Sequence, residues 1–512
     1  MCKDKELLQI IINCFKIEDE EPNDSDDDVK KELKNNKKEK IEFPLDYQII
    51  DKLSKLEGKI KDSDTDYTIF EYNDEVIELW NLLIIKAIKC LRFFDNREPF
   101  CNKDSSEKRP LAYGTEELFE YYKDYVEFEK VLYGGASFYR DHVLHVFRVW
   151  MLGIKSCLEN NFDYLKHLGF HDFVVYDKQG ILTSSEKLSI WTIIALTHDL
   201  GYPLEKAKNV IDHTQRMVKS FINNPTINMN LSFDGTQNIM NDFVIKFISS
   251  KMILQKDKEE EAKDPLNKVY VARLQSKYYF KFQKSLEHNA HGILSSLIIY
   301  KLLLYFLESD FSINEDYHFD REEARQFYIR REILRAIASH TCADIYHMNV
   351  YSYSFLLILC DDAQEWGRKG IENLYIAPTI QYDFGAIQFI TAEEETVCTI
   401  NDKYTVPKEE MKYIKEIIWK NIREYNNKKK IFRDGQDTDK RDFSFKKVTE
   451  IYIRGGANPT VKLHFDICKN QVSMLYFIKA EAEPIKEIIV NMEDKNTKSL
   501  FKESGDKILY CE

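Results

Sequence analysis

One apolar stretch, residues 191–203, constrains the fold of this chain more than any other. It reads Trp-Thr-Ile-Ile-Ala-Leu-Thr-His-Asp-Leu-Gly-Tyr-Pro, and its apolar residues have the spacing of a buried helix. Gly201 and Pro203 predict the end of that helix, because glycine relaxes the backbone and proline cannot continue a helix. His198 and Asp199 therefore stand side by side at a helix end that the pattern predicts to be buried.

An ionisable pair in such a place needs an interaction that offsets its loss of hydration. A divalent metal ion supplies one, because a neutral imidazole and a carboxylate are both suitable ligands. The alternative is a capping Asp beside a core His, which is the commoner interpretation of a single His-Asp dipeptide. A second pair, His171-Asp172, has the pattern of a loop or short strand and predicts no metal site.

Other His and Asp residues end or interrupt apolar helical runs elsewhere in the chain. Residues 139–150 have a helical pattern in which His142, His145 and Arg148 share one face. Further along, three more runs carry such residues, and each can point inward from a helix. These downstream positions are His288, His291, His340, Asp361 and Asp362.

The order His, His-Asp, His, His, Asp resembles that of the HD-domain superfamily of metal-dependent phosphohydrolases, over about residues 135–370. The resemblance implies a helical core that holds one or two divalent ions, with Mn²⁺, Fe²⁺ and Mg²⁺ among the candidates. In two-metal branches of the superfamily Asp199 would bridge the ions. The implied ligands are His145, His198, Asp199 and Asp361 for the first ion, with Asp362 as the alternative to Asp361, and His291 and His340 for the second.

The resemblance also implies which residues would act on the substrate. Asp199 belongs to the catalytic centre, and in one-metal branches His291 would face the scissile phosphate. His291 or His288 could protonate the leaving oxygen. The residues that could contact phosphate are His142, Arg148, Lys206, Tyr202, Arg331 and Arg368, although arginines such as Arg331 could instead pair with nearby glutamates.

Tyr202 departs from the pattern of the deoxynucleoside triphosphohydrolases in this superfamily. Those enzymes usually have a His directly after His-Asp-x-Gly, where it helps to activate the attack. With Tyr202 in that position, the acid–base role would fall to His291, His288 or Glu205.

These residues lead us to expect a metal-dependent phosphohydrolase that acts on nucleotides through metal-activated water, with a deoxynucleoside triphosphate as the first substrate to test. A cyclic or linear dinucleotide phosphodiesterase is the alternative within the same class. A di-iron oxygenase, which shares this ligand order, and a non-catalytic nucleotide sensor are alternatives of other classes. The resemblance further implies a homo-oligomer with a nucleotide as allosteric effector.

At 512 residues the chain is too long for one compact core. We expect a mainly α protein with a helical HD-type core. Residues 380–512 include strand-like alternation at 461–467 and 472–478, which predicts a small α+β domain. The expected division is 1–42, a short helix and a charged disordered linker; 43–134, an N-terminal helical extension; 135–379, the phosphohydrolase core; and 380–512, the C-terminal α+β domain.

Charge and hydropathy limit the partners and the compartment. A net charge of −13 argues against nucleic acid as a partner. No apolar run has the length of a membrane span, and the first residues show no signal-peptide pattern. The ten cysteines include no CxxC pair, so neither a disulfide framework nor a structural zinc site is expected. A cytoplasmic location follows as the expectation.

Overall fold

The structure is a computed structural model, and the expectations for residues 17–45 and for His171-Asp172 lie outside the residues it describes. The described residues are 3–16, 46–61, 72–91, 115–135, 141–169, 182–221, 235–255, 269–307, 317–345, 351–368, 381–391, 396–407, 414, 416–418, 420–421, 443–456, 459–466, 471–476 and 486–491.

The chain forms two compact units. The first contains Met1–Cys342 and Tyr351–Asp361, and the second contains Ala343–Val350 and Asp362–Glu512. Among the described residues the first unit is helical apart from one hairpin, whereas the second carries a sheet. The expectation of a mostly helical chain with a sheet near its C-terminus is therefore confirmed, while membership of the HD superfamily stays a prediction.

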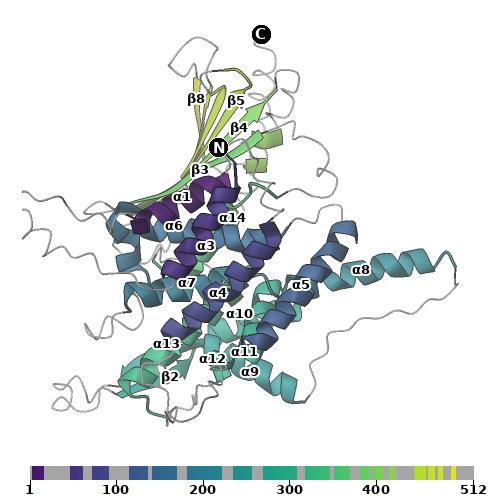
Figure 1. Cartoon of the computed structure of the whole chain (residues 1–512), viewed down its shortest axis with the longest axis vertical. Helices are drawn as coiled ribbons and strands as arrows, with labels where there is room; N and C mark the ends of the chain where they lie inside the picture. The colour runs from purple at the N-terminus through teal and green to yellow at the C-terminus, as the bar shows by residue number, and fades with distance from the viewer. Residues whose placement is uncertain are drawn as a thin grey trace, which may run out of the picture. The chain divides into compact units, whose positions relative to one another are not determined.

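The first unit begins with helices that precede the predicted metal residues (Figure 1). Helix α1 packs against α3 and α6, and α4 packs against α7. Trp80 of α4 stacks on Tyr122 of α5 with their ring centroids 4.0 Å apart. These helices are α1 (Lys3–Lys16), α3 (Tyr47–Lys59), α4 (Asn73–Leu91) and α5 (Glu116–Gly135).

The remaining elements of the first unit follow α5 along the chain. They are α6 (Val143–His167), α7 (Ser184–Thr197), α8 (Tyr202–Val218), α9 (Thr236–Ile248), the hairpin of β1 (Ser250–Gln255) and β2 (Val269–Leu274), α10 (Ser276–Glu287), α11 (His291–Leu302), α12 (Leu304–Leu307), α13 (Arg321–Ser339) and α14 (Tyr353–Ala363), the last of which runs into the second unit.

Helix α7 is the central helix of this unit. A capping box between Thr183 and Glu186 starts it, which satisfies two backbone N–H groups that have no partner inside the helix. All its residues from Lys187 to Thr197 are buried, so the whole circumference packs against neighbours. A Cβ at Gly153 of α6 would lie 2.0 Å from the Trp191 ring, so only glycine permits this close packing of α6 on α7.

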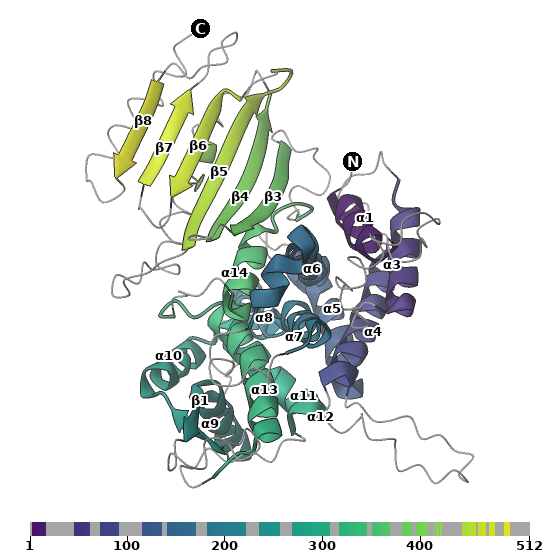
Figure 2. The same ribbon diagram turned by 90° about the vertical axis from the view of Figure 1, so that its left-hand side faces the viewer.

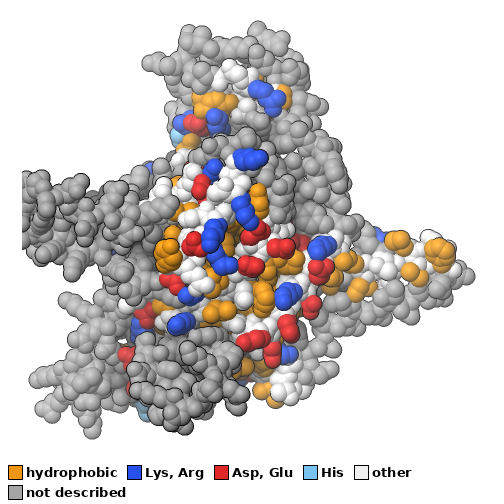
Figure 3. Space-filling model, in the orientation of Figure 1, with side chains coloured by type: hydrophobic (Ala, Val, Ile, Leu, Met, Phe, Trp, Pro, Cys, Tyr) orange, Lys and Arg blue, Asp and Glu red, His pale blue; other side chains and the backbone are white. Residues whose placement is uncertain are grey.

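Two features bear on the membrane and on the surface. No helix in the described part of the chain is both long enough and apolar enough to cross a bilayer. On the face drawn in Figure 3, cationic and anionic side chains are interspersed rather than gathered into one patch. Lys55–Asp51 and Lys52–Glu78 are examples of exposed ion pairs in the first unit.

The described residues of the second unit form six strands, which lie in the sheet in chain order (Figure 2). All neighbours are antiparallel except β4 and β5, which are parallel and separated by a segment with helical residues near Ile417. Ile400, Ile451 and Leu463 are buried and share one face of the sheet. The strands are β3 (Gln381–Thr391), β4 (Thr396–Val406), β5 (Phe443–Ile453), β6 (Val461–Asp466), β7 (Gln471–Tyr476) and β8 (Lys486–Asn491).

Candidate metal centre

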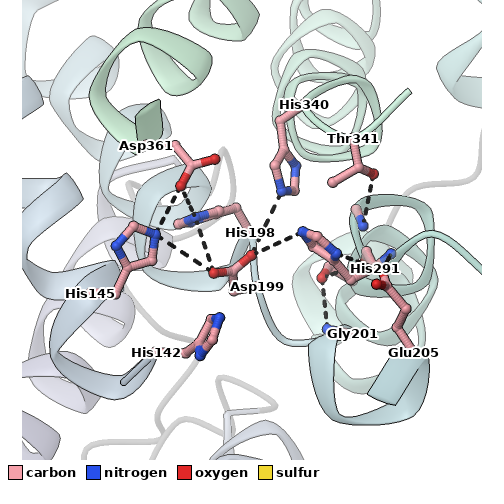
Figure 4. A network of polar contacts seen from close by, with 12 residues as sticks. His142, His145, His198, Asp199, Gly201, Glu205, His291, His340, Thr341 and Asp361 are labelled. Atoms are coloured by element: carbon pink, nitrogen blue, oxygen red, sulfur yellow. Dashed lines mark hydrogen bonds and ion pairs between the residues drawn. The ribbon is translucent and has the colours of Figure 1, made fainter. Parts of the chain in front are cut away.

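Six side chains from five helices or helix ends converge in the first unit (Figure 4). His198 and Asp199 follow the last residue of α7, and His340 follows the last residue of α13. The other three come from α6, α11 and α14. We call this set the cluster, and its members are His145, His198, Asp199, His291, His340 and Asp361.

Asp199 lies at the middle of the cluster, and its two oxygens face different histidines. Oδ2 lies 3.7 Å from His145 Nε2 and 3.6 Å from His198 Nε2. Oδ1 lies 3.3 Å from His291 Nε2 and 3.7 Å from His340 Nε2. Most of these separations are too long for hydrogen bonds. They are close to the roughly 3.0–3.4 Å between two ligands that each lie about 2.1 Å from one ion.

Asp361 closes the cluster on the other side. Its Oδ1 lies 2.8 Å from His145 Nε2 and 3.8 Å from His198 Nε2. Two groups of ligand atoms lie within 4.8 Å of one another, and each could hold a metal ion: His145, His198 and Asp361 form one, and His198, Asp199 and His340 form the other. Neither group of the described residues includes His291 or Asp362.

The orientation of two inner histidines suits a cation. His198 Nδ1 lies 2.8 Å from the carbonyl oxygen of Ala195, and His340 Nδ1 lies 2.6 Å from that of Ile337. Nδ1–H therefore donates to the backbone, and in the neutral imidazole the Nε2 lone pair faces the cluster. Both Nε2 atoms are buried and have no hydrogen-bond partner within the described part of the chain. Such buried polar atoms need an explanation, and a cation held by these donors fits.

The charges in the cluster are strongly coupled. Burial opposes the charged form of His198, but the nearby carboxylates of Asp199 and Asp361 outweigh it and raise the pKa of this imidazole to about 9. Burial likewise opposes ionisation of both carboxyls. The surrounding histidines outweigh that effect and hold the pKa of Asp199 and of Asp361 well below the usual range. Both carboxylates are therefore ionised near neutral pH and can act as ligands.

His291 is held differently, because its partner is a side chain. Glu205 Oε2 lies 2.7 Å from His291 Nδ1 and accepts the backbone N–H of the same residue at 2.9 Å. Burial raises the pKa of Glu205, but His291 and Lys206 outweigh burial and lower it to about 2. An ionised Glu205 thus fixes the His291 ring with Nε2 directed at Asp199.

Tyr202 lies between two histidines beside Asp199. Its ring stacks on His142 with the centroids 3.9 Å apart and meets the His291 ring edge-on at 5.3 Å. Lys206 Nζ lies 5.0 Å from the centroid of the same tyrosine ring. Glu129 of α5 supports His142 by accepting its backbone N–H at 2.6 Å.

Two glycines allow the helix ends to meet. A Cβ at Gly201 would lie 2.4 Å from the His291 carbonyl oxygen, and one at Gly292 would lie 2.6 Å from the Ile337 carbonyl oxygen.

The N-terminal helices contribute two hydrogen bonds to the end of α7. Trp80 Nε1 donates to the carbonyl of Leu196, and Tyr121 Oη donates to that of Leu200, at 2.7 and 2.8 Å. These two donors satisfy carbonyls at the end of α7, where helical partners run out.

Two arginines predicted to bind phosphate have other roles in the structure. Arg148 is fully buried and bonds to Asp4. Arg331 is also fully buried, and it donates to the Ser250 carbonyl and pairs with Glu332. Their guanidinium groups are already engaged inside the protein, so we no longer assign phosphate binding to either arginine.

Three further predicted residues lie outside the cluster contacts. His288 is exposed at the end of α10, and its Nδ1 lies 2.7 Å from the Lys284 carbonyl oxygen, which does not favour a role as catalytic acid. Asp362 and Arg368 belong to the second unit. Their proposed roles, as an alternative ligand and as a phosphate contact, stay predictions.

Glu129 was not predicted from the sequence, and Glu205 was predicted only as one of three candidates for the acid–base role. Neither lies in a recognisable motif with its histidine, since Glu205 precedes His291 by 86 residues. Glu205 does follow Tyr202 by three residues at the start of an amphipathic helix, which is a weak signal that it lies on the same face as Tyr202.

Comparison of the chain with protein-family models, with curated proteins and with solved structures found no match.

Proposed function

We propose that this chain is a metal-dependent phosphohydrolase acting on nucleotides, of the HD-domain type. The observation that supports this most is the pair of buried Nε2 atoms, on His198 and His340, that face the Asp199 carboxylate without a hydrogen-bond partner among the described residues. A cation is the group that such donors suit best.

Four residues would hold the first ion: His145, His198, Asp199 and Asp361. His340 and the second oxygen of Asp199 face the other way and could hold a second ion, with His291 beside them. A bound divalent ion supplies Lewis acidity, because it lowers the pKa of a coordinated water and neutralises charge on phosphoryl oxygens.

The rim of the cluster supplies the remaining chemistry. The side chains of His291 and Asp361 are 19% and 30% exposed, whereas that of His145 is only 1% exposed, so a substrate would approach from the side of the first two. Glu205 holds the His291 ring at that side, with Nε2 3.3 Å from Asp199 Oδ1. His291 is therefore the protein group best placed to hold a proton for the leaving oxygen.

A deoxynucleoside triphosphate is the first substrate to test, and a dinucleotide phosphodiester is the second. The small number of cationic side chains near the cluster favours the second substrate. Arg148 and Arg331 are engaged elsewhere. Lys206 lies near Tyr202 and His291, but it already pairs with Glu205. The single negative charge of a phosphodiester group needs fewer cationic side chains around it than the several charges of a triphosphate.

The test is product analysis by chromatography. The purified chain is incubated with deoxynucleoside triphosphates, ribonucleotides and cyclic dinucleotides, each with Mn²⁺, Mg²⁺ or Fe²⁺ and with mixed nucleotides present as activators. Asp199→Ala is run in parallel, and Asp212→Ala, an exposed position on α8, is the matched control. We expect turnover that falls by more than about 10³-fold in Asp199→Ala, since several ligand contacts disappear together, and that persists in Asp212→Ala.

The products distinguish the branches. Tripolyphosphate plus a nucleoside would identify a triphosphohydrolase, whereas a linear dinucleotide or a mononucleotide would identify a phosphodiesterase. Absence of turnover in every combination would contradict the proposal. Oxygen uptake with Fe²⁺ would then favour an oxygenase, and thermal stabilisation by nucleotide without turnover would favour a sensor.

A further inference from the structure

A buried ion pair joins helix α1 to helix α6. Arg148 Nε donates to Asp4 Oδ1 at 2.9 Å, and Arg148 Nη2 donates to Asp4 Oδ2 at 2.7 Å. Both side chains are fully buried. The paired geometry, with two donors on two oxygens, is the strong form of an arginine–carboxylate contact.

This pair lies one helical turn from a candidate metal ligand. Arg148 follows His145 by three residues on α6, so the two side chains leave the helix on the same side. His145 Nε2 in turn contacts Asp361 and Asp199. Arg148, which binds α1, and His145, which belongs to the cluster, therefore lie in the same turn of α6.

Helix α1 does more than provide one carboxylate. It packs against both α6 and α3, and it buries four apolar side chains there: Leu7, Leu8, Ile11 and Ile12. Removal of α1 would leave Arg148 as a buried charge without its carboxylate, and breaking a buried pair in this way is strongly destabilising. That destabilisation would fall on the turn of α6 that also carries His145.

We propose that α1 is a docking element, and that its ion pair with Arg148 positions His145 and thereby sets the affinity of the cluster for its cation. The inference rests on the metal site of the proposed function but not on the reaction. Because coupling between two binding events is reciprocal, a cation in the cluster also tightens the attachment of α1. Asp4 and Arg148 are positioning residues, since they act through His145.

The first test is hydrogen exchange on the unaltered full chain, with and without saturating Mn²⁺. We expect Mn²⁺ to slow exchange of the backbone amides of α1, and we expect no such change in Asp199→Ala. Equal exchange of the α1 amides with and without bound Mn²⁺ would overturn the inference. If α1 changes the affinity for Mn²⁺, then Mn²⁺ must change the attachment of α1 by the same factor.

The second test is equilibrium titration of Mn²⁺ into Asp4→Asn. We expect binding about tenfold weaker, which is within the usual range for coupled sites. Asp51→Asn, an exposed aspartate whose partner is Lys55 on the same helix, is the matched control and should bind Mn²⁺ as the unaltered chain does. Arg148→Lys replaces Asp4→Asn if the latter does not fold, because lysine keeps the charge but loses the paired geometry.

The outcomes separate this inference from the proposed function. A lowered melting temperature with unchanged Mn²⁺ affinity would mean that the pair only stabilises the fold, and the inference would fail alone. Failure of the unaltered chain to bind Mn²⁺ would overturn both. Coupled Mn²⁺ binding without turnover of any nucleotide would support the inference while the phosphohydrolase proposal fails.

Discussion

His198 and His340 lie in the inner part of the cluster with Nδ1 bonded to backbone carbonyls, whereas His291 lies at the rim with Nδ1 bonded to Glu205. The inner rings are 0–1% exposed and the rim ring is 19% exposed. The partner of each inner ring is a neutral backbone carbonyl that its helix fixes, whereas the partner of the rim ring is a charged side chain. The difference suggests that the inner part holds the ion and the rim acts on the substrate.

The largest change in turnover is expected from a substitution at the rim, and it tests whether rim and inner part have different roles. His291→Gln should lower turnover by about 10²–10⁴-fold, the usual contribution of a positioned acid–base group, while Mn²⁺ affinity stays nearly unchanged. Turnover is measured at saturating metal, and affinity by titration. A loss of Mn²⁺ affinity as great as the loss of turnover would show that His291 is a ligand, and the contrast would break down.

The proposed metal-binding role is tested by the two adjacent aspartates of α14. Asp361→Asn should weaken Mn²⁺ binding by more than about 100-fold, above the range for residues that only support a ligand. Asp362→Asn should leave Mn²⁺ affinity unchanged, because Asp361 is the residue whose carboxylate contacts His145. The reverse result would show that Asp362, and not Asp361, is the ligand from α14.

Glu205 tests how the rim is held. Glu205→Gln keeps the size of the side chain but removes its charge, and we expect turnover to fall by about 10–100-fold. Glu287→Gln, on the exposed surface of α10, is the matched control. Unchanged turnover in Glu205→Gln would mean that the orientation of His291 does not depend on this carboxylate.

The smallest effect is expected where an N-terminal helix supports the end of α7. Tyr121→Phe removes the hydrogen bond to the Leu200 carbonyl, and we expect the free energy of unfolding to fall by about 1 kcal/mol. Urea denaturation measures this loss. A cost well above that value would mean that Tyr121 also contributes packing that its neighbours cannot replace.

Much of the candidate site could be predicted from local sequence. The His-Asp pair ends an apolar helix, and Gly201 and Pro203 mark where that helix stops. Each remaining member of the cluster also lies at the end of an apolar run or within one. Local pattern is informative here because a buried polar residue interrupts a run of apolar residues.

Pairing between distant segments could not be predicted in the same way. Arg148 has the residue type and the spacing expected of a phosphate contact, but its partner lies 144 residues away in α1. The Glu205–His291 contact likewise depends on how α8 and α11 pack. Helical periodicity fixes which side of a helix a residue occupies, but not which segment covers that side.

The second unit shows the same limit on the level of the fold. Alternating residues predicted strands at 461–467 and 472–478, close to where β6 and β7 lie. The sequence analysis did not identify β3, β4, β5 or β8. The β4–β5 pair is parallel, and the partner of a parallel strand is set by a crossover rather than by a short turn.

The most direct test of the whole account is the metal content of the purified full chain after equilibration with Mn²⁺ and removal of the unbound ion. The account predicts at least one ion bound per chain, and a loss of that ion in Asp199→Ala but not in Asp212→Ala. A chain that retains no ion, or that retains the same amount after Asp199→Ala, would contradict the claim that this cluster is a metal centre.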